Sequence, residues 1–394
     1  MDPHHPANNV DAKGDYLKGK NIWVGVTGSV SCVETVGIIR ELLRYKANVT
    51  VVANRAALEL VGEKSLEFAC GKPVIKEITG QVEHVIAGHK ADLLMVTPCC
   101  ATSLGKMANG IGDNPPMLVA LTCIGAKTPI IVAPAMDQNM AKSEIVKRNL
   151  KAVKKFANVV EPVMVEGKAK LPSKERLVAE ACNIAGPKTL ERRKVLVIGG
   201  GSNELIDDVR VISNRSSGLM AISLAECAFA MGAKVDLWLG NSTHDAGDWI
   251  KTRDFGTLTN LKTMVKEIKN YDAVIMPAAL SDFIPTYTKG KLDSAKSITL
   301  KMKKAPKIIS SIRKKHKGLL YAFKLGSRIS DKELLDKAEI LLKNADCVIA
   351  NHSEAMGSDK SKVAIVDKKN TEWISGNKRY LSTKIMEKIA SEMN

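Results

Sequence analysis

The sequence predicts an α/β protein made of two consecutive doubly wound domains, each built on a mainly parallel sheet. Short, continuously apolar runs alternate with helical periods in the first half of the chain, and the same alternation starts afresh in the second half. Strands that are apolar throughout are typical of parallel sheets covered by helices on both faces. The length of 394 residues also favours two domains over one.

The first half opens with residues 1–19, which lack the apolar core of a signal peptide and are rich in Asn, Gly, His and Asp, so a disordered leader is expected. A helix is expected at 33–45, where apolar residues recur at three- and four-residue spacing. β-branched apolar runs predict strands at 22–27, 49–53, 92–97 and 129–134.

The periodicity loosens between residues 165 and 193, which are rich in Gly, Lys, Pro and Glu. A boundary near Pro187 therefore gives a first domain over 20–187 and a second over 188–394. In the second domain, a helix is expected at 217–231. Strands are expected at 195–198, 234–239, 273–276, 319–323, 346–350 and 363–366.

The net charge of +17 fits either a nucleic-acid binder or an enzyme with anionic substrates. The lysines are spread out and aromatic residues make up only 4%, which favours small anionic substrates and no nucleic acid. No apolar run reaches the roughly 18 residues that a membrane span needs. The eight cysteines show no CxxC pairing, which indicates free thiols in a reducing cytoplasm rather than a zinc site.

A turn of small residues, Gly25 to Val30, follows the first strand and opens a helix. Such turns direct backbone N–H groups and a helix N-terminus at an anion, although many are only tight connections. The turn is not a GxGxxG motif, so a nicotinamide dinucleotide is not implied.

Three further segments occur in order after this turn: His84 to Asp92, Thr97 to Asp113 and Ala133 to Met140. Together they resemble the phosphopantothenoylcysteine decarboxylase family of flavoproteins. The resemblance implies a flavodoxin-like domain that binds FMN, with His84 at the active site. It also implies that FMN is contacted by Gly28, Ser29, Thr102 and Ser103. A loop that contains Met136 and Asp137 would close over the substrate carboxylate.

The first half departs from the family's pattern at two places. Asp137 stands where the family usually has Asn, and an ionised carboxylate can only accept hydrogen bonds. The stretch from Glu166 to Pro172 lacks the cysteine that the flap of bacterial members carries, so it looks more like an archaeal-type variant. The proton donor of the last step is therefore left open, as is the activity of this half.

The second half carries a longer match, from Gly200 through Arg210 to Gly218, which resembles the phosphopantothenate–cysteine ligase signature. The glycine pair Gly200 and Gly201 makes room for a nucleotide, and the polar side chains before the next helix offer donors to a phosphate. Arg210 can pair with an acid. The resemblance implies a Rossmann-like ligase domain in which Asn214 and Arg210 act catalytically.

Downstream, Pro277 to Phe283 matches a strand end of that family, and Lys289 to Ser294 matches its mobile lysine loop. In the family a lysine of this loop, here Lys291, stabilises charge on an acyl-nucleotide. Departures stand at Ala305 and Lys307 and after Phe323. The resemblance implies nucleotide contacts from Gly200, Gly201, Ser216, Ser217, Pro277, Ala278, Ala279, Asp282, Lys291, Pro306, Lys307, Ile308, Ile309, Phe323, Lys337 and Lys343.

The two resemblances imply a bifunctional enzyme of coenzyme A biosynthesis. CTP and Mg²⁺ would activate 4′-phosphopantothenate for ligation with cysteine, and FMN would support decarboxylation to 4′-phosphopantetheine; no metal ligand is assigned. A cytoplasmic homo-oligomer is expected. Three matters stay open: ATP in place of CTP, a monofunctional ligase with an inactive first domain, and a non-catalytic flavin- or nucleotide-binding regulator.

Overall fold

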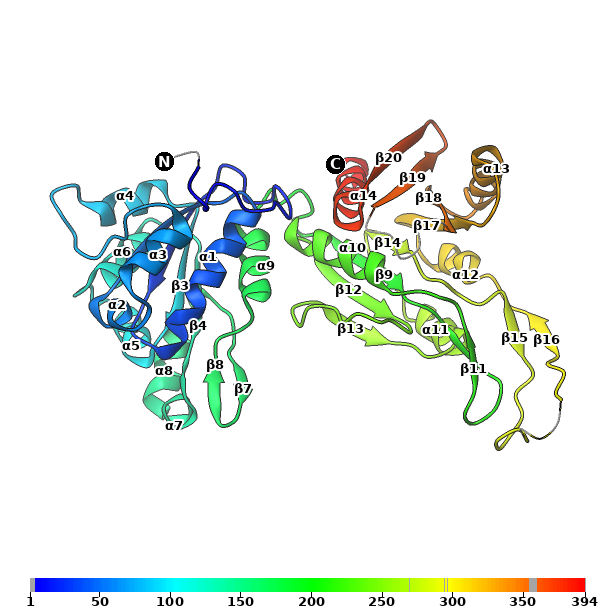
Figure 1. The fold of residues 1–394 in the computed structure, drawn as a ribbon, viewed down its shortest axis with the longest axis horizontal. Coiled ribbons are helices and arrows are strands. Elements are labelled where there is room, and N and C mark those ends of the chain that lie inside the picture. Colours follow the sequence, from blue (N-terminus) through cyan, green and yellow to red (C-terminus); the bar gives the residue numbers. More distant parts are fainter. Residues whose placement is uncertain (1–3, 269, 294, 296, 354–359, 394) are drawn as a thin grey trace. The chain divides into compact units, whose positions relative to one another are not determined.

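The computed structural model describes residues 4–268, 270–293, 295, 297–353 and 360–393 (Figure 1). The chain divides into two compact units, Met1–Lys188 and Thr189–Asn394. Both are α/β units with mainly parallel sheets, as the sequence predicts.

The first unit has a five-stranded parallel sheet of order β2-β1-β3-β4-β6, the flavodoxin-like order. Its strands are β1 (Asn21–Val26), β2 (Asn48–Ala53), β3 (Leu93–Cys99), β4 (Ile130–Pro134) and β6 (Asn158–Val159). Every residue of β3 is buried, in keeping with a central strand covered on both faces.

Helices connect these strands: η1 (Val30–Glu34), α1 (Thr35–Arg44), α2 (Arg55–Val61), α3 (Glu63–Cys70), α4 (Glu83–Lys90), α5 (Ala101–Asn109), α6 (Pro115–Gly125), α7 (Gln138–Lys142), α8 (Glu144–Val153) and α9 (Lys174–Ala185). Side-chain caps mark several starts; the Asn114 side chain, for example, accepts from Met117 N before the two prolines of α6. A small antiparallel sheet of order β5-β8-β7 combines β5 (Met136–Asp137), β7 (Val163–Val165) and β8 (Lys168–Lys170).

The segment before β1 differs from the expected disordered leader. Tyr16 is 9% exposed and Leu17 is fully buried, and Lys13 forms a 2.5 Å ion pair with Glu41 of α1. Burying two large apolar side chains stabilises an ordered arrangement that composition alone does not indicate.

The second unit has an eight-stranded sheet of order β13-β12-β9-β14-β17-β18-β19-β20. The first six strands are parallel and follow the Rossmann order, and β19 and β20 add an antiparallel hairpin at the β18 edge. The strands are β9 (Lys194–Gly199), β12 (Lys234–Leu239), β13 (Lys251–Asp254), β14 (Ala273–Met276), β17 (Leu319–Gly326), β18 (Cys347–His352), β19 (Lys360–Asp367) and β20 (Thr371–Asn377).

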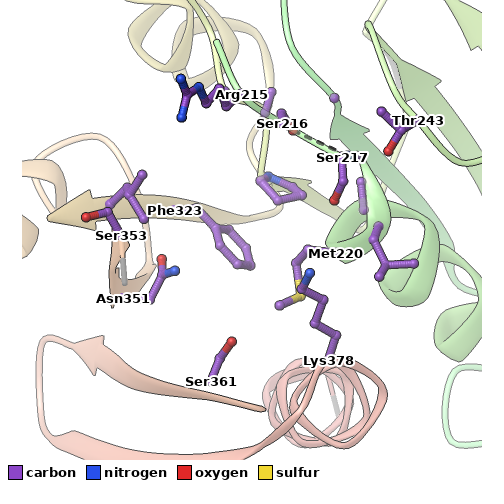
Figure 2. A pocket seen from close by; sticks show the side chains of 18 of the residues that line it. Arg215, Ser216, Ser217, Met220, Thr243, Phe323, Asn351, Ser353, Ser361 and Lys378 are labelled. Atoms are coloured by element: carbon purple, nitrogen blue, oxygen red, sulfur yellow. Dashed lines mark hydrogen bonds between the residues drawn. The ribbon is translucent and has the colours of Figure 1, made fainter. Parts of the chain in front are cut away.

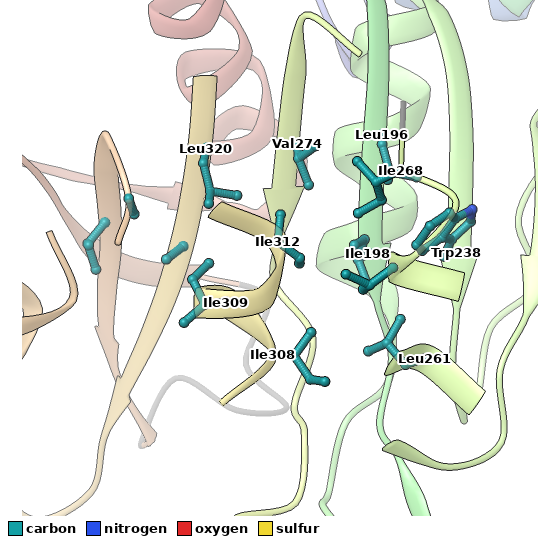
Figure 3. Close-up of a cluster of buried hydrophobic side chains, with 14 of the residues drawn as sticks. Leu196, Ile198, Trp238, Leu261, Ile268, Val274, Ile308, Ile309, Ile312 and Leu320 are labelled. Atoms are coloured by element: carbon teal, nitrogen blue, oxygen red, sulfur yellow. The ribbon is translucent and has the colours of Figure 1, made fainter. Parts of the chain in front are cut away.

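Among the described residues, five helices cover this sheet: α10 (Leu219–Ala230), α11 (Leu258–Val265), α12 (Ile308–Lys315), α13 (Asp331–Leu341) and α14 (Lys378–Met393). One buried cluster joins α11, α12 and α13 to Leu196, Val274 and Leu320 of the sheet (Figure 3). Side chains of successive strand residues point to opposite faces, so Tyr321 and Phe323 face the other side, which α10 and α14 cover.

Two short hairpins stand outside this sheet. One pairs β10 (Asn203–Leu205) with β11 (Val211–Ser213), and the other pairs β15 (Phe283–Pro285) with β16 (Met302–Lys304). They expose large apolar side chains, among them Phe283 at 56% and Leu205 at 46%.

Candidate functional site

In the first unit, the predicted flavin-binding turns follow neighbouring strands at the carboxyl edge of the sheet. Thr27 Oγ1 donates to Pro98 O at 2.8 Å and accepts from Cys100 N at 3.1 Å, which ties the turn after β1 to the turn after β3. Gly28 and Ser29 on one turn are thereby brought beside the start of α5, which carries Thr102 and Ser103. This edge is where open α/β sheets bind their ligands.

The turn after β1 requires glycine at position 28. A Cβ there would lie 2.6 Å from the Ala56 Cβ, too close for any other residue without a shift. Ser29 caps the short helix η1, and its Oγ accepts from Ser31 N at 3.4 Å. The chain therefore offers a close backbone approach and hydroxyl groups, which suit a flavin phosphate.

At the second turn, Cys100 caps α5, and its Sγ lies 3.3 Å from Ser103 Oγ. Burial raises the pKa of the Cys100 thiol, but hydrogen bonds from Ser103 and Thr27 outweigh burial, so its pKa lies below the ordinary value. Cys100 was not among the predicted site residues, although it lies in the segment Thr97 to Asp113 that carries the flavoprotein resemblance.

His84 lies in the first turn of α4. A helix between parallel strands runs back along the sheet, so its first turn lies toward the carboxyl edge. Among the described residues, His84 Nδ1 and Thr97 Oγ1 are buried side-chain atoms with no hydrogen-bond partner. A buried polar atom without a hydrogen bond raises the free energy of the folded protein. Both atoms therefore fit a bound ligand that supplies hydrogen-bond partners.

The predicted substrate loop is part of the small antiparallel sheet. Met136 pairs with Ala169, and Asp137 with Lys168, which places the loop against the β7–β8 hairpin that occupies the flap region. Asp137 Oδ1 accepts from Asn139 N at 2.8 Å and caps α7. The carboxylate is thus engaged as an acceptor, and the nearby amides of Gln138 and Asn139 are the donors that this loop offers.

In the second unit, Gly200 allows three strand ends to meet. Its φ is +78°, and a Cβ would lie 2.8 Å from the backbone of Gly240. Gly200 O accepts from Ala279 N at 2.9 Å, and Gly201 N donates to Asn241 O at 2.9 Å. The glycine pair predicted to make room for a nucleotide therefore also joins β9 to the ends of β12 and β14.

We expect Gly200→Ala to destabilise the second unit by about 1–3 kcal/mol, since the substitution adds a positive-φ cost to a backbone clash. Ligase activity should fall with it. Thermal unfolding followed by circular dichroism measures the change, and Gly256→Ala is the control, because a Cβ there meets only Asn260 Oδ1 at 3.5 Å. Equal melting temperatures for the two variants would contradict the expectation.

A pocket of about 810 Å³ opens at the carboxyl edge of this sheet, at the N-terminus of α10 (Figure 2). It brings together seven of the residues predicted for nucleotide binding: Gly200, Ser216, Ser217, Pro277, Ala278, Ala279 and Phe323. The pocket is large enough for a nucleotide-sized ligand.

The same pocket is also lined by residues outside the predicted set, among them Arg215, Thr243, Asn351, Ser361 and Lys378. Arg215 lies inside the ligase signature, so the motif could have predicted it as a pocket residue. Ser361 lies on β19 and Lys378 follows β20, at the edge of the sheet, where no motif marks them.

Other predicted residues lie away from the pocket lining. Ile308 and Ile309 are 3% and 5% exposed and belong to the cluster beneath α12, because their side chains face the sheet. Pro306 is exposed just before α12, and Lys337 and Lys343 are exposed on α13 and just after it. Their side chains are not among those that line the cavity.

Asp282 and Asn214 have specific structural partners. Asp282 Oδ1 forms a 2.5 Å ion pair with Lys307 Nζ. Asn214 Nδ2 donates to Ala279 O at 3.1 Å and to Leu280 O at 3.0 Å, which holds the segment after β14 beside the pocket. Asn214 thus fixes the backbone that lines the site.

The loop that carries Lys291 is fastened by Asp207. The Asp207 carboxylate accepts from Leu292 N at 3.0 Å and from Arg210 Nη1 at 2.7 Å, and Arg210 also donates to Leu292 O at 3.1 Å. Hydrogen bonds hold the pKa of Asp207 well below its usual range. The N–H of Leu292 contributes most, followed by the N–H groups of Val209 and Arg210 and the Arg210 guanidinium. Arg210 therefore positions the lysine loop.

Asp208 fastens the same loop at a second point. Its carboxylate accepts from Tyr287 Oη and, at 3.0 Å, from Gly290 N. Lys291 itself is exposed between the two anchors, and of the lysine loop only Ser294 lies outside the described residues.

Asp207→Asn is expected to lower the ligase kcat roughly ten- to hundredfold, since a misplaced catalytic loop costs about that much. Because the folded-state pKa of Asp207 is depressed, its stabilisation is present at neutral pH and is lost only as pH falls below the usual aspartate range. Steady-state ligation at pH 7.5 measures the loss, with exposed Asp336→Asn as control. A kcat equal to that of the control would exclude this role.

Comparison with known proteins identifies both halves. The Flavoprotein family model matches residues 11–186, and the model of the DNA/pantothenate metabolism flavoprotein C-terminal domain matches residues 190–393. The coenzyme A biosynthesis bifunctional protein CoaBC of Thermococcus kodakarensis is 37% identical over 376 residues, covering 92% of this chain and 93% of that protein. The chain belongs to the CoaBC family.

A second archaeal member, CoaBC of Methanocaldococcus jannaschii, is 34% identical and covers 96% of this chain and 95% of its own length. The crystal structure of the DNA/pantothenate metabolism flavoprotein from Streptococcus pneumoniae matches 51% of this chain and 99% of that chain, at 26% identity and a TM-score of 0.48. The family predicted from the sequence motifs, an archaeal-type bifunctional protein, is confirmed.

This CoaBC member thus combines a flavoprotein decarboxylase domain with a ligase domain in one enzyme of coenzyme A biosynthesis. The alternative of a ligase with an inactive first domain is not favoured, because the bifunctional relatives are matched over both halves. Among the helices that the structure describes, none is long and apolar enough to cross a bilayer.

Proposed function

We propose that the second unit uses CTP and Mg²⁺ to convert 4′-phosphopantothenate to an acyl-cytidylate, releasing pyrophosphate, and then joins the acyl group to the amine of cysteine. The first unit would decarboxylate the resulting 4′-phosphopantothenoylcysteine to 4′-phosphopantetheine. The observation that carries the ligase assignment is the 810 Å³ pocket where the signature residues Gly200, Ser216 and Ser217 meet the β14 end.

The chemistry of the pocket supports acyl activation. Ser216, Ser217 and the N-terminus of α10 present donors to phosphate oxygens, and Phe323 offers an apolar surface within the same cavity. Lys291, on the loop held by Asp207 and Asp208, can bring a mobile ammonium to the charge that develops as the acyl-cytidylate forms. A divalent cation would neutralise the triphosphate.

In the first unit, bound FMN would supply a reversible two-electron oxidation: it would oxidise the cysteine thiol to a thioaldehyde, which eases loss of CO₂, and would return the two electrons to give the thiol of the product. The residues that would hold it are Gly28, Ser29, Thr102 and Ser103, which the Thr27 hydrogen bonds gather at one sheet edge. The imidazole of His84 has a buried ring nitrogen free to move a proton. The loop at Met136 and Asp137, backed by the β7–β8 hairpin, would cover the substrate carboxylate.

A mass-resolved assay tests the whole proposal. Purified enzyme with recorded visible absorbance is mixed with phosphopantothenate, cysteine, Mg²⁺ and either CTP or ATP. A flavin spectrum with formation of phosphopantetheine supports both steps, and the two nucleotide arms establish the preference. Accumulated phosphopantothenoylcysteine would refute the decarboxylase step alone, whereas no product with either nucleotide would refute the ligase assignment.

The enzyme is also proposed to act as a cytoplasmic homo-oligomer without nucleic-acid partners. The apolar side chains that the two hairpins expose, such as Leu205, Val211 and Phe283, support self-association, because solvated apolar surface of this kind is typical of interfaces. Light scattering coupled to gel filtration measures the oligomer, and a monomer at micromolar concentration would refute it.

A further inference from the structure

One end of the ligase pocket is lined by polar residues outside the signature motifs. Lys378 begins α14, Ser361 lies on β19 and Asn351 lies on β18, so three separate elements supply them. Figure 2 shows Lys378, Ser361 and Asn351 around the lower part of the pocket, across from Ser216 and Ser217. Three converging polar groups from different elements indicate a built site rather than a solvated surface.

Among the described residues, no side-chain hydrogen bond or ion pair engages the Ser361 hydroxyl or the Lys378 ammonium. Ser361 is only 8% exposed, yet its hydroxyl has no side-chain hydrogen bond among the described residues. Lys378 is half-buried, and no carboxylate of the described chain lies within ion-pair distance of its ammonium. Both residues line the cavity, so a ligand bound there can supply hydrogen-bond partners to the Ser361 hydroxyl and the Lys378 ammonium.

The other basic residues of α14 each have an acidic partner. Arg379 pairs with Glu226 at 3.4 Å, Lys384 with Glu387 at 2.8 Å, and Lys388 with Asp367 at 2.6 Å. Lys378, which alone of these four lines the pocket, is the one whose charge is left unpaired in the described chain.

The opposite end of the pocket has its own group of donors. Arg215, Ser216 and Ser217 lie at the start of α10, and Phe323 lies between the two ends (Figure 2). A cavity of about 810 Å³ with basic and hydroxyl groups at both ends suits a ligand, or a pair of ligands, with two separated anionic groups. Under the proposed function, two of the three ligase substrates, 4′-phosphopantothenate and CTP, carry phosphate.

We propose that Lys378, Ser361 and Asn351 form a second phosphate-binding subsite of the ligase pocket, distinct from the one at Arg215, Ser216 and Ser217. This rests on the proposed ligase function. The ammonium and the hydroxyl donate to phosphate oxygens, and the Asn351 amide adds a neutral donor. The phosphate belongs either to 4′-phosphopantothenate or to the nucleotide.

Steady-state ligation by Lys378→Met tests the subsite. Loss of a charge-assisted hydrogen bond is expected to raise KM for one phosphorylated substrate about 10- to 100-fold, with kcat changed much less. Lys384→Met, which removes the same charge from the exposed face of α14, is the matched control and should keep wild-type KM values. Ser361→Ala should raise the same KM to a smaller extent.

Two arms distinguish the phosphate sources. If the subsite holds the pantothenate phosphate, the wild type prefers phosphopantothenate to pantothenate, and Lys378→Met loses most of that preference. If it holds a nucleotide phosphate, KM for CTP rises and the preference stays. Calorimetric titration with phosphopantothenate and with CTP gives the same comparison without turnover.

The outcomes separate this inference from the proposed function. A wild type without ligase activity would sink the ligase assignment, whereas an active wild type with unchanged KM and binding constants in Lys378→Met would overturn the subsite alone. Circular dichroism melting confirms that each variant is folded. Should Lys378→Met fail to fold, Ser361→Ala decides, and an unchanged KM for both substrates in that variant overturns the subsite.

Discussion

Replacing His84 by Asn is expected to stop decarboxylation while leaving ligation intact, so that phosphopantothenoylcysteine accumulates. The imidazole lies in the first turn of α4, and its Nδ1 is buried with no partner among the described residues. Asn keeps a polar group of similar reach but cannot take up and release a proton near neutral pH. Loss of a positioned acid–base group lowers a rate by about 10²- to 10⁴-fold.

Mass spectrometry of the products after a fixed time measures this loss, and the visible spectrum shows whether the variant still holds flavin. His89→Asn is the matched control, because His89 lies exposed in the last turn of the same helix. Wild-type phosphopantetheine formation by His84→Asn would remove His84 from the mechanism. A colourless variant would instead assign the residue to flavin binding.

The central strands were the most predictable part of the fold. The runs 234–239 and 273–276 match β12 and β14 to the residue. β14 is apolar throughout and mostly buried, which is the pattern of a strand covered on both faces. The expected helix at 217–231 begins at Leu219, since Gly218 precedes it with φ +72°. A residue with positive φ cannot continue a right-handed helix, but the sequence does not show which glycines adopt a positive φ.

The edge of the second sheet was less predictable. β19 (Lys360–Asp367) is longer than the expected strand at 363–366, because only its central residues are apolar and buried. β20 exposes part of each face and has no such apolar run. Because α14 follows β20, the position of Lys378 in the pocket could not be read from local pattern. Tertiary packing of these edge elements sets it.

Some residues of the candidate sites could be predicted from the sequence and others could not. Ser216, Ser217 and Pro277 reach the pocket because strand order fixes which carboxyl ends meet. A motif does not show which face of a helix turns inward: the side chains of Ile308 and Ile309, which were predicted to contact the nucleotide, are buried in the core. The role of Arg210 depends on the Asp207 contact, which a sequence can suggest only as one of several pairings.

Lys291→Gln is expected to lower the ligase kcat about 10²- to 10³-fold, with KM for CTP changed far less. The Lys291 side chain is exposed, while hydrogen bonds to Asp207 and Asp208 fix the backbone on either side of it. This arrangement leaves a mobile ammonium on a fastened loop, suited to charge that appears only as the acyl-nucleotide forms. Removing such an electrostatic contact costs mainly the chemical step.

Glutamine retains length and hydrogen-bonding groups, so the comparison isolates the positive charge. Lys289→Gln changes the same charge two residues earlier in the loop, on the other side of the Gly290 anchor, and should ligate at close to the wild-type rate. Decarboxylation of supplied phosphopantothenoylcysteine by both variants provides an internal standard, because that step belongs to the first unit. If both variants lost kcat equally, the loop would act through its overall charge, and Lys291 would have no individual role in the transition state.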